Sequence, residues 1–251
     1  MLTEERQEEI LRIVNTGGAA SVQELVSCLN ISESTVRRDL LAMDREGKLR
    51  RVHGGATSLK DNAYNADMEN LRDKYSLHMP DKRRIAQFAA AQIGKDDFVY
   101  VDAGSTTEQM AEYLSGSEAS FVTNSIPLAQ KLARSDVSVY ILPGRVKGKT
   151  EAIIGSEMRD MLSQYHFTKG FFGTNGLSLR DGCTTPDAEE AACKRAAVRQ
   201  CSKAYILADS SKFGLSAHIT FAALQQVAIV TSESSDVDYE PYHHLTEVHV
   251  L

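Results

Sequence analysis

The sequence lacks the patterns that mark secreted, zinc-binding and membrane proteins. It has only four cysteines in 251 residues, and they form neither a C-x-x-C pair nor a cysteine–histidine cluster of zinc-ligand spacing. Such sparse cysteine indicates reduced thiols in the cytosol. No apolar run approaches membrane-spanning length, and the N-terminus has no signal-peptide apolar core. We therefore expect a cytoplasmic protein with no membrane partner, no metal and no cofactor.

The sequence also lacks the overall basic charge that is typical of nucleic-acid-binding proteins. Its formal net charge is −6, with 28 basic and 34 acidic residues. The charge is unevenly distributed, however, because residues 31–60 contain seven Lys or Arg residues against four Asp or Glu residues. Apolar residues make up 42% of the chain and charged residues 25%, the usual balance of a globular protein. The length fits one or two domains, with a locally basic segment near the start.

Residues 21–56 carry the most informative pattern, which predicts two short helices followed by a hairpin. Ser21, with Glu24 three residues later, has the spacing of a capping box, so a helix is expected to begin there. Ser32 is expected to cap the next helix. The apolar residues that repeat at helical spacing in this second helix are Val36, Leu40 and Met43.

The exposed start of the second helix and the strand after it carry hydroxyl and guanidinium groups. Such groups at a helix N-terminus contact the major groove in helix-turn-helix proteins. Residues 49–53 read as a basic strand, and the following Gly-Gly signals the tight turn of a wing along the phosphates. The residues expected to contact DNA are Ser32, Ser34, Thr35, Arg37, Arg38, Arg50, Arg51, His53 and Gly54. The alternative, a small helical domain with solvated arginines, leaves the basic hairpin without a role.

The stretch SESTVRRDLLAMDREGKLRRVHGGA resembles the DNA-binding domain of the DeoR family of bacterial repressors. The matching features are the S-x-S/T-x-R-R-D-L core, the later glycine and the R-x-H-G-G-A end. The resemblance implies a winged helix-turn-helix domain that binds double-stranded operator DNA, which we place at residues 1–59. Because one recognition helix covers little DNA, we expect a homodimer or homotetramer on symmetric half-sites.

The rest of the chain reads as a connection followed by an α/β domain. Residues 60–63 have loop composition, and residues 66–77 have the spacing of a linker helix that could carry a dimer contact. We place the linker at residues 60–80 and the second domain at residues 81–251. From residue 98, apolar runs such as FVYV and VAIV alternate with helical patterns. That alternation predicts a mostly parallel sheet covered on both faces by helices.

Small polar residues, glycines and charges follow nearly every predicted strand. The first strand is followed by DAGSTT, and later strands or loops end in TNS, PGR, GTNG, TTPD and DSSKFG. Ligands of open α/β sheets bind beyond the carboxyl ends of the strands, so these turns are expected to form one site. Amides, hydroxyls and a cation suit a phosphate, and carboxylates suit sugar hydroxyls. Each turn alone is a weak signal, because Asp187 and Asp209 also fit plain helix caps and Lys212 fits a solvated lysine.

These turns resemble the sensor domain of the DeoR family, so the resemblance spans nearly the whole chain. It implies an architecture like that of ribose-5-phosphate isomerase and glucosamine-6-phosphate deaminase, and a phosphorylated sugar as effector. The phosphate contacts that the resemblance implies are Gly104, Ser105, Thr106, Thr107 and Lys212. The sugar contacts that it implies are Asp102, Asn124, Arg145, Asn175, Asp187 and Lys194, and the expected site also includes Thr123 and Gly144.

The stretch GTNGLSLRDGCTTPDAEEAACKRAA is most similar to the fructose-operon repressors of that family, which respond to fructose 1-phosphate. The usual G-F-T-T-P-D reads G-C-T-T-P-D here, with Cys183 in place of the aromatic residue. Regulators of the galactitol and tagatose type share parts of the stretch. The expected effector is therefore fructose 1-phosphate or another hexose phosphate such as tagatose 6-phosphate.

Two other functions compete with a sugar-responsive repressor. A phosphosugar isomerase-like enzyme needs a general base at the strand ends, but the D-G-A-D-E run of ribose-5-phosphate isomerase is missing. Moreover, His166 precedes its strand and His218 follows the SKFG loop. A constitutive DNA-binding protein would not need the polar strand ends. We therefore expect a non-enzymatic repressor of a sugar operon whose repression is relieved by a phosphorylated sugar effector.

Overall fold

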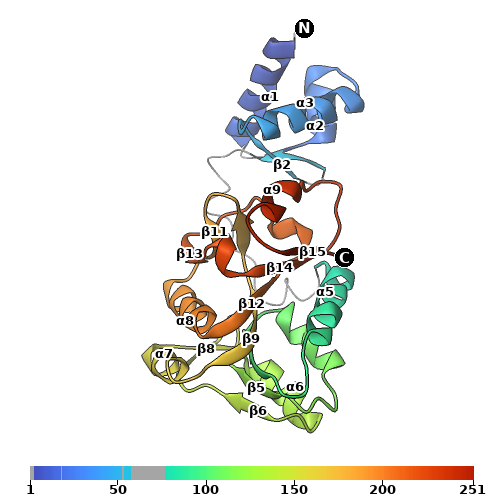
Figure 1. Cartoon of the computed structure of the whole chain (residues 1–251). Coiled ribbons are helices and arrows are strands. Elements are labelled where there is room, and N and C mark those ends of the chain that lie inside the picture. Colours follow the sequence, from blue (N-terminus) through green and yellow to red (C-terminus); the bar gives the residue numbers. More distant parts are fainter. Residues whose placement is uncertain (1–2, 18, 53, 58–76) are drawn as a thin grey trace. The chain divides into compact units, whose positions relative to one another are not determined.

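The computed structural model describes residues 3–17, 19–52, 54–57 and 77–251, which belong to two compact units (Figure 1). The first unit is Met1–Asn65 and the second is Ala66–Leu251. His53 and nearly all of the predicted linker helix lie outside the described residues. Within the described ranges, no helix is both long and apolar enough to span a membrane.

Three helices build the first unit: α1 (Thr3–Gly17), α2 (Val22–Leu29) and α3 (Glu33–Arg45). The predicted capping box is confirmed at the start of α2. The Glu24 N–H donates to Ser21 Oγ at 3.1 Å, and the Ser21 N–H donates to the Glu24 carboxylate at 2.7 Å. Ser32 caps α3 as expected. The three apolar residues predicted for the inner face of α3 are at most 1% exposed, so that prediction is also confirmed.

An ion pair between α1 and α3 holds α3 in place. Asp39, in the middle of α3, is only 4% exposed. Its carboxylate accepts hydrogen bonds from the Arg6 guanidinium, one of them at 3.0 Å. Because a buried carboxylate needs such a partner, the Asp of the R-R-D-L run has a structural role.

The predicted wing is present as a small antiparallel sheet. Its strands are β1 (Ala19–Ser21), β2 (Arg50–Val52) and β3 (Gly55–Thr57), in the order β1-β3-β2. Gly54 has φ +83° in the turn between β2 and β3, a conformation that favours glycine. A Cβ on Gly55 would lie 2.2 Å from the Ala20 carbonyl oxygen. The Gly-Gly pair therefore serves both the turn and the close approach of β3 to β1.

A seven-stranded sheet forms the centre of the second unit. Its strand order is β15-β14-β12-β9-β4-β5-β6, and all neighbours are parallel. The strands are β4 (Phe98–Val101), β5 (Ser120–Thr123), β6 (Val139–Ile141), β9 (Phe167–Gly173), β12 (Cys201–Leu207), β14 (Ala228–Thr231) and β15 (Val248–Val250). The predicted parallel α/β sheet is thus confirmed.

Helices cover both faces of this sheet (Figure 1). On one face, α5 (Met79–Ala91) and α6 (Ile126–Arg134) pack on Val99, Val101 and Phe171. On the other, α7 (Ser156–Leu162) and α8 (Ala188–Arg199) pack on Tyr100 and Phe172. Alternate residues of the same strands enter the two cores, as expected for strands buried on both sides.

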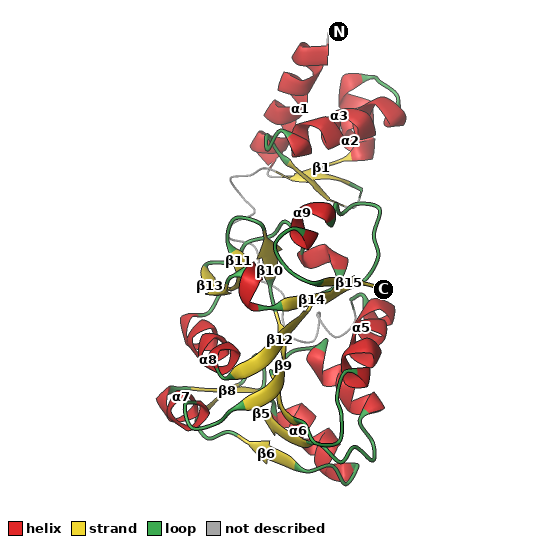
Figure 2. Ribbon diagram, viewed as in Figure 1, coloured by secondary structure: helices red, strands yellow, loops and turns green. Residues whose placement is uncertain are grey.

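Short antiparallel elements were not predicted from the sequence (Figure 2). They are the hairpin of β7 (Arg145–Lys147) and β8 (Ala152–Ile154) and the sheet of β10 (Gly176–Ser178), β11 (Gly182–Thr185) and β13 (Ile219–Ala222). Strands of three or four residues are too short for a clear alternating pattern. The helix predicted after β4 is a 3-10 helix, η2 (Thr107–Tyr113). The remaining short helices are η3 (Ser210–Lys212), η4 (Leu224–Gln226) and α9 (Glu240–His243).

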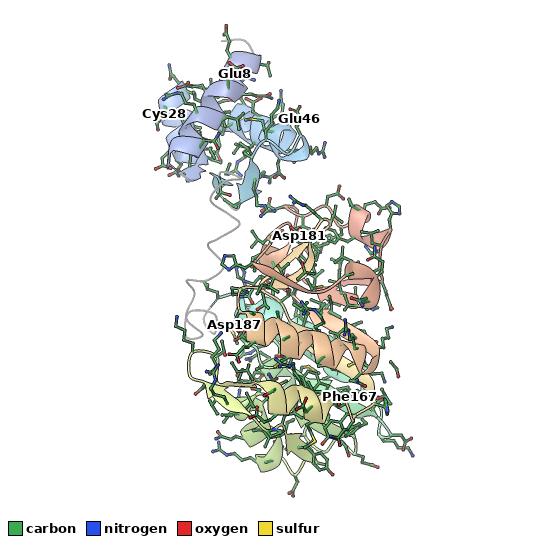
Figure 3. The ribbon with its side chains drawn as sticks, turned by 90° about the vertical axis from the view of Figure 1, so that its left-hand side faces the viewer. Glu8, Cys28, Glu46, Phe167, Asp181 and Asp187 are labelled. Carbon is green, nitrogen blue, oxygen red and sulfur yellow. The ribbon has the colours of Figure 1, made fainter. Side chains whose placement is uncertain are left out.

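All four cysteines are free thiols, in agreement with the sequence-based expectation. Cys28 is exposed on α2 (Figure 3), whereas Cys183 and Cys193 are buried in the second unit. Cys183, which replaces the aromatic residue of the motif, lies in the core under α8. Burial raises its pKa to about 12, so the thiol stays protonated and packs as a small apolar group.

Candidate functional site

The exposed start of α3 presents the side chains predicted to read DNA. The Ser32 hydroxyl caps the helix and lies 3.0 Å from the Ser34 hydroxyl and 2.8 Å from that of Thr35. Arg37 forms an exposed ion pair with Glu33, one turn earlier, at 2.6 Å. Arg38 is exposed and has no ion-pair partner among the described residues. Arg38 is therefore the guanidinium that can contact a base or phosphate without first breaking a bond.

The wing strand is tied to the same helix. The Arg51 N–H donates to the Asp44 carboxylate at 3.0 Å, so α3 and β2 are held together. Arg50 and Arg51 are half-buried at their places in β2. Gly54 is exposed in the turn that follows. The described part of the predicted DNA-contact set thus lies on two connected elements of one small unit.

A cavity of about 680 Å³ lies in the second unit, beyond the carboxyl ends of the central strands. Its wall includes the residues after β4, β5, β9 and β12, the start of α5, the β7–β8 hairpin and the start of α8. The residues predicted for the effector site that line it are Asp102, Gly104, Ser105, Thr106, Asn124, Asn175, Asp187, Lys194 and Lys212. The topology brings nine predicted residues together because parallel strands end at the same edge of a sheet.

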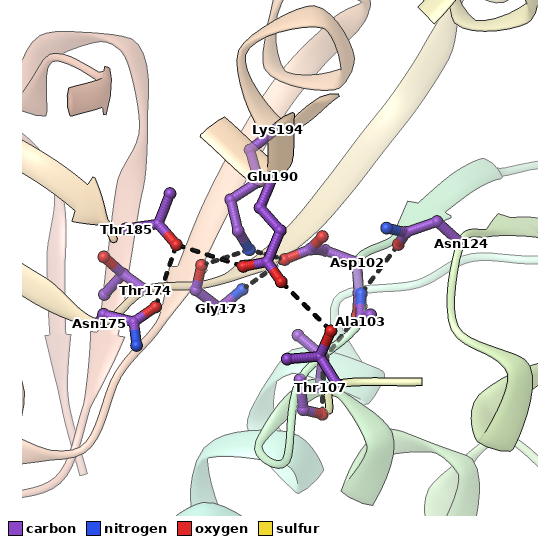
Figure 4. A network of polar contacts seen from close by, with 12 residues as sticks. Asp102, Ala103, Thr107, Asn124, Gly173, Thr174, Asn175, Thr185, Glu190 and Lys194 are labelled. Carbon is purple, nitrogen blue, oxygen red and sulfur yellow. Dashed lines mark hydrogen bonds and ion pairs between the residues drawn. The ribbon is translucent and has the colours of Figure 1, made fainter. Parts of the chain in front are cut away.

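A buried ion pair forms the floor of the cavity (Figure 4). Asp102 follows β4 and Lys194 lies on α8, and their side chains are 3% and 8% exposed. The Lys194 ammonium also donates to the Gly173 carbonyl oxygen at 3.0 Å, and the Gly173 N–H donates to the Asp102 carboxylate at 3.2 Å. Burial raises the pKa of Asp102 above its ordinary value, although Lys194 acts in the opposite direction. The floor is therefore fully hydrogen-bonded before any ligand enters.

The turn after β4 is shaped by side chains behind it. The Asn124 side-chain oxygen accepts from the Ala103 N–H at 2.9 Å, and its amide donates to the Ile153 carbonyl oxygen at 3.1 Å. The Thr107 hydroxyl donates to the Asp102 carbonyl oxygen at 2.7 Å. These bonds hold residues 103–106 in the conformation that lines the cavity. Asn124 and Thr107 thus position the turn more than they offer free groups to a ligand.

A second polar network forms the opposite wall. Asp187 caps α8, accepting from the backbone N–H groups of Glu189 and Glu190. Lys147, from the β7–β8 hairpin, donates to Asp187 at 2.9 Å and to Glu190 at 3.0 Å. Burial acts to lower the pKa of Lys147, but its bonds to Asp187 and Glu190 outweigh it and raise that pKa. The hairpin is thereby fastened to the start of α8.

One part of the cavity wall offers free donors. Lys212 has no ion-pair partner among the residues that the structure describes. Ser105 and Thr106 also line the cavity. Their backbone N–H groups donate no hydrogen bond to another described residue. Unpaired amides and an ammonium are the groups that bind phosphate oxygens. This part of the wall has the chemistry of an anion site.

Four residues predicted for the effector site do not line the cavity, which corrects their placement. Thr107 and Thr123 are fully buried, and the Thr123 hydroxyl donates to the Val101 carbonyl oxygen at 2.6 Å. Gly144 packs under β8, where a Cβ would lie 2.5 Å from the Ile154 carbonyl oxygen. The Arg145 side chain is 64% exposed and pairs with Glu189. The chain bends back into the β7–β8 hairpin after β6, and this bend takes the P-G-R turn away from the cavity.

Several cavity residues were missed in the sequence. They are Leu77, His78, Lys82, Lys147, Lys149, Thr150 and Glu190, whereas Thr174, Asp209 and Ser211 belong to the GTNG and DSSKFG turns that were expected at this edge. Lys147 and Thr150 enter through the β7–β8 hairpin, which has no strong sequence signal apart from Gly148 between its strands. Glu190 lies in the TTPDAEE stretch, for which no role of this residue was predicted. Its proximity to the site depends on the hairpin that it binds, which sequence spacing does not reveal.

Comparison with known proteins gives two domain matches and several close relatives. Residues 6–62 match the DeoR-like helix-turn-helix domain, and residues 77–234 match the DeoR C terminal sensor domain. The chain is 39% identical over 252 residues to the uncharacterized HTH-type transcriptional regulator FruR of Bacillus subtilis, covering 100% of this chain and 99% of that protein. It is 32% identical to a lactose phosphotransferase system repressor of Staphylococcus epidermidis, with 93% of each covered.

Among solved structures, ribose 5 phosphate isomerase A from Neisseria gonorrhoeae shares 19% identity with 53% of the chain, at a TM-score of 0.40. That match covers 52% of the isomerase chain, and a likeness of this size carries no functional conclusion. The two domain matches and the full-length relatives carry the assignment instead. The chain belongs to the DeoR family of transcription regulators.

Proposed function

We propose that this protein represses a sugar-uptake or catabolic operon and leaves its operator when a phosphorylated sugar occupies the cavity. Its family membership supports a DNA-binding regulator. The name of its relative from Staphylococcus epidermidis, a lactose phosphotransferase system repressor, supports a role in sugar metabolism. The cavity beyond the strand ends supports a small-molecule effector.

The observation that carries the proposal is the juxtaposition of unpaired donors and carboxylate groups in one cavity. Lys212 and the amides of Ser105 and Thr106 supply unpaired donors for phosphate oxygens. On the wall fastened by Lys147, the carboxylates of Asp187 and Glu190 supply acceptors for sugar hydroxyls. A phosphorylated polyhydroxy compound needs both kinds of group, whereas an apolar effector needs neither.

For the DNA-bound form we propose that α3 enters the major groove and that the β2–β3 wing lies along the phosphates. Ser34, Thr35 and Arg38 are then the first side chains to meet base edges, while Arg50 and Arg51 contact the backbone. Asp39 does not oppose this contact, because its charge is compensated by Arg6. A second subunit is required for symmetric half-sites, so the active form is a homodimer or homotetramer.

For the effector we propose fructose 1-phosphate or a close hexose phosphate such as tagatose 6-phosphate. The free sugar is expected to bind far more weakly than its phosphate, because Lys212 and the two amides would hold no anion. The effector releases DNA only if it binds the DNA-free arrangement more tightly than the DNA-bound one, and a coupling of about 1–3 kcal/mol is typical.

Titration calorimetry with fructose 1-phosphate, tagatose 6-phosphate and fructose tests the site. Lys212→Ala should weaken phosphosugar binding roughly ten- to a hundredfold, since a hydrogen bond to a charged group contributes about 1.5–3 kcal/mol. It should leave effector-free DNA binding unchanged. Lys95→Ala is the matched control, because Lys95 is an exposed lysine before β4, at the opposite end of that strand from the cavity.

Equal affinity for fructose and its phosphate, or unchanged binding by the Lys212→Ala protein, would overturn the proposed site. The same samples should be assayed for turnover of each phosphosugar. A ligand that binds and is recovered unchanged supports a regulator, whereas steady conversion would support the alternative of an isomerase-like enzyme.

A further inference from the structure

The outer strand of the parallel sheet is apolar, and no second strand among the described residues pairs with its outer edge. β6 ends the strand order, with β5 as its only partner among the described residues, and Figure 1 shows it as the outermost arrow. Tyr140 is 55% exposed and Ile141 50% exposed, although neighbouring residues of a strand point to opposite faces. Soluble proteins usually protect such an edge with charge, proline or a covering segment. The three residues of β6 carry no charge, so this edge lacks that protection and can pair with another strand.

The hydrogen bonds to β5 show which backbone groups of β6 are free. The Phe121 N–H donates to the Ser138 carbonyl oxygen at 2.9 Å, and the Leu142 N–H donates to the Thr123 carbonyl oxygen at 3.0 Å. Backbone groups alternate in direction along a strand, so the N–H and C=O of Tyr140 also face β5. Those of Val139 and Ile141 face outward. The free edge therefore offers two donors and two acceptors, on the first and last residues of the strand.

This arrangement is complementary to itself. If two copies of β6 run antiparallel with Tyr140 on a two-fold axis, Val139 of each copy lies opposite Ile141 of the other. Residues directly opposite in a hydrogen-bonded pair exchange both of their N–H···O bonds, so the two such pairs make four hydrogen bonds. All the outward groups of both strands are then used. No shift in register is needed, because the pattern of free groups is symmetric about Tyr140.

The side chains match in the same register. The two copies of Tyr140 form the central non-hydrogen-bonded pair, in which side chains lie closest and aromatic rings stack across strands. On the other face, Ile141 of one copy meets Val139 of the next. Like residues that meet across an axis define an isologous, closed contact. A strand of unrelated sequence could bind the same backbone groups, but it would not supply the matching Tyr140–Tyr140 and Ile141–Val139 side-chain pairs.

We propose that β6 pairs with β6 of a second copy of this chain, which joins two sensor units into one continuous sheet across a two-fold axis. The interface places two identical subunits in one particle, the arrangement that symmetric DNA half-sites require. It involves neither the cavity nor the DNA-binding unit. Its test therefore needs no effector and no DNA. If the wild type is oligomeric and Tyr140→Lys leaves its mass unchanged, this interface fails while the proposed function stands.

Cross-linking tests the register directly. In a non-hydrogen-bonded antiparallel pair the Cα atoms lie about 4.5 Å apart, within the range of roughly 4.4–6.8 Å that a disulfide spans. Tyr140→Cys should therefore form a disulfide-linked dimer rapidly under mild oxidation. The full-length protein should carry Cys28→Ser as background, because Cys28 is exposed (Figure 3). Leu179→Cys is the matched control, since Leu179 is 47% exposed outside the sheet.

Sedimentation equilibrium provides the second measurement. Tyr140→Lys places two like charges opposite each other, so the particle mass should fall to half that of the wild type at the same concentration. Leu179→Lys should leave the mass unchanged, and circular dichroism should show that both variants are folded. A monomeric wild type, an unchanged mass for Tyr140→Lys, or cross-linking of Tyr140→Cys no faster than of Leu179→Cys would each overturn the proposal.

Discussion

Asp102 and Lys194 illustrate how single residues set the chemistry of the cavity. Both are nearly buried, and each has its remaining hydrogen bonds to the backbone of Gly173. Removing two charges from water is costly, and the pairing recovers that cost only when the geometry satisfies both groups. The Lys194 ammonium also lies 5.4 Å from the centre of the Phe221 ring, which favours a cation there. The pair thus keeps polar groups at the cavity floor without leaving either of them unpaired.

Breaking this pair should destabilise the second unit in a pH-dependent way. Lys194→Met leaves the Asp102 carboxylate buried without a counter-charge, which should cost about 3–5 kcal/mol of unfolding free energy near pH 8. Burial already raises the folded-state pKa of Asp102 above its ordinary value, and loss of Lys194 raises it further. A group of this kind contributes stability at low pH, and that stability is lost as pH rises through the folded-state pKa. The loss should therefore be smaller near pH 5.

Urea unfolding of the wild type and the variant at both pH values measures this difference. Lys203→Met is the control, because Lys203 forms an exposed pair with Glu247 at 2.7 Å. An exposed pair contributes about 1 kcal/mol or less. A Lys194→Met protein that loses no more stability than this control, or the same amount at both pH values, would contradict the expectation.

At the scale of elements, α3 has one side fixed by packing and one side exposed. Val36, Leu40 and Met43 hold its inner face, and Asp39 is bonded to Arg6 on α1. Ser32 fixes where the helix begins. The exposed residues of α3 are therefore held in a fixed geometry by the rest of the unit. Binding by these residues would need little change of the backbone.

Arg38→Ala should weaken operator binding more than Arg37→Ala does. Arg38 is free, so its loss should cost about 1–3 kcal/mol if it reads a base, with relaxed specificity at that base. If it contacts only phosphate, binding should weaken uniformly and the salt dependence should decrease. Arg37 must first leave Glu33, which offsets part of its contribution.

Fluorescence anisotropy on an operator mapped by footprinting, at two salt concentrations, distinguishes these outcomes. Arg45→Ala serves as the control, because Arg45 lies at the other end of α3. Unchanged operator affinity in the Arg38→Ala protein would reject the proposed docking of α3. Effector affinity should be the same in all three variants.

At the scale of the whole molecule, the candidate DNA contacts and the cavity belong to separate compact units. The candidate DNA contacts all lie within the first unit, and the cavity is lined entirely by the second. A bound effector stabilises only the unit that holds it, by about 2.7 kcal/mol at a hundred times its dissociation constant. Differential scanning calorimetry with fructose 1-phosphate should therefore shift the transition of the second unit.

Hydrogen exchange can assign each transition to its unit, and fructose at the same concentration is the control. An effector that raised the melting temperature of the first unit alone would contradict a cavity site in the second. A phosphosugar that shifted neither transition would remove the support for this class of effector.

Much of the fold follows from patterns a few residues long. The Ser21–Glu24 capping box, the Ser32 cap and the Gly54-Gly55 turn were each predicted from adjacent residues, and each is present. The parallel sheet was predicted from apolar runs that alternate with helical spacing, and it too is confirmed. These features are local, since a cap or a buried strand depends on residues within one turn or one strand.

The sequence by itself determined where α2 and α3 begin, the parallel class of the sheet, the family and the set of polar turns from which nine cavity residues come. Only the tertiary structure decided how those groups pair. Asp102 and Lys194 are 92 positions apart, and Lys147 reaches Glu190 over 43. Their meeting depends on β9 lying beside β4 and on the β7–β8 hairpin folding against α8. The free edge of β6 likewise follows from strand order, because spacing shows that a strand is buried or exposed but not which strand lies beside it.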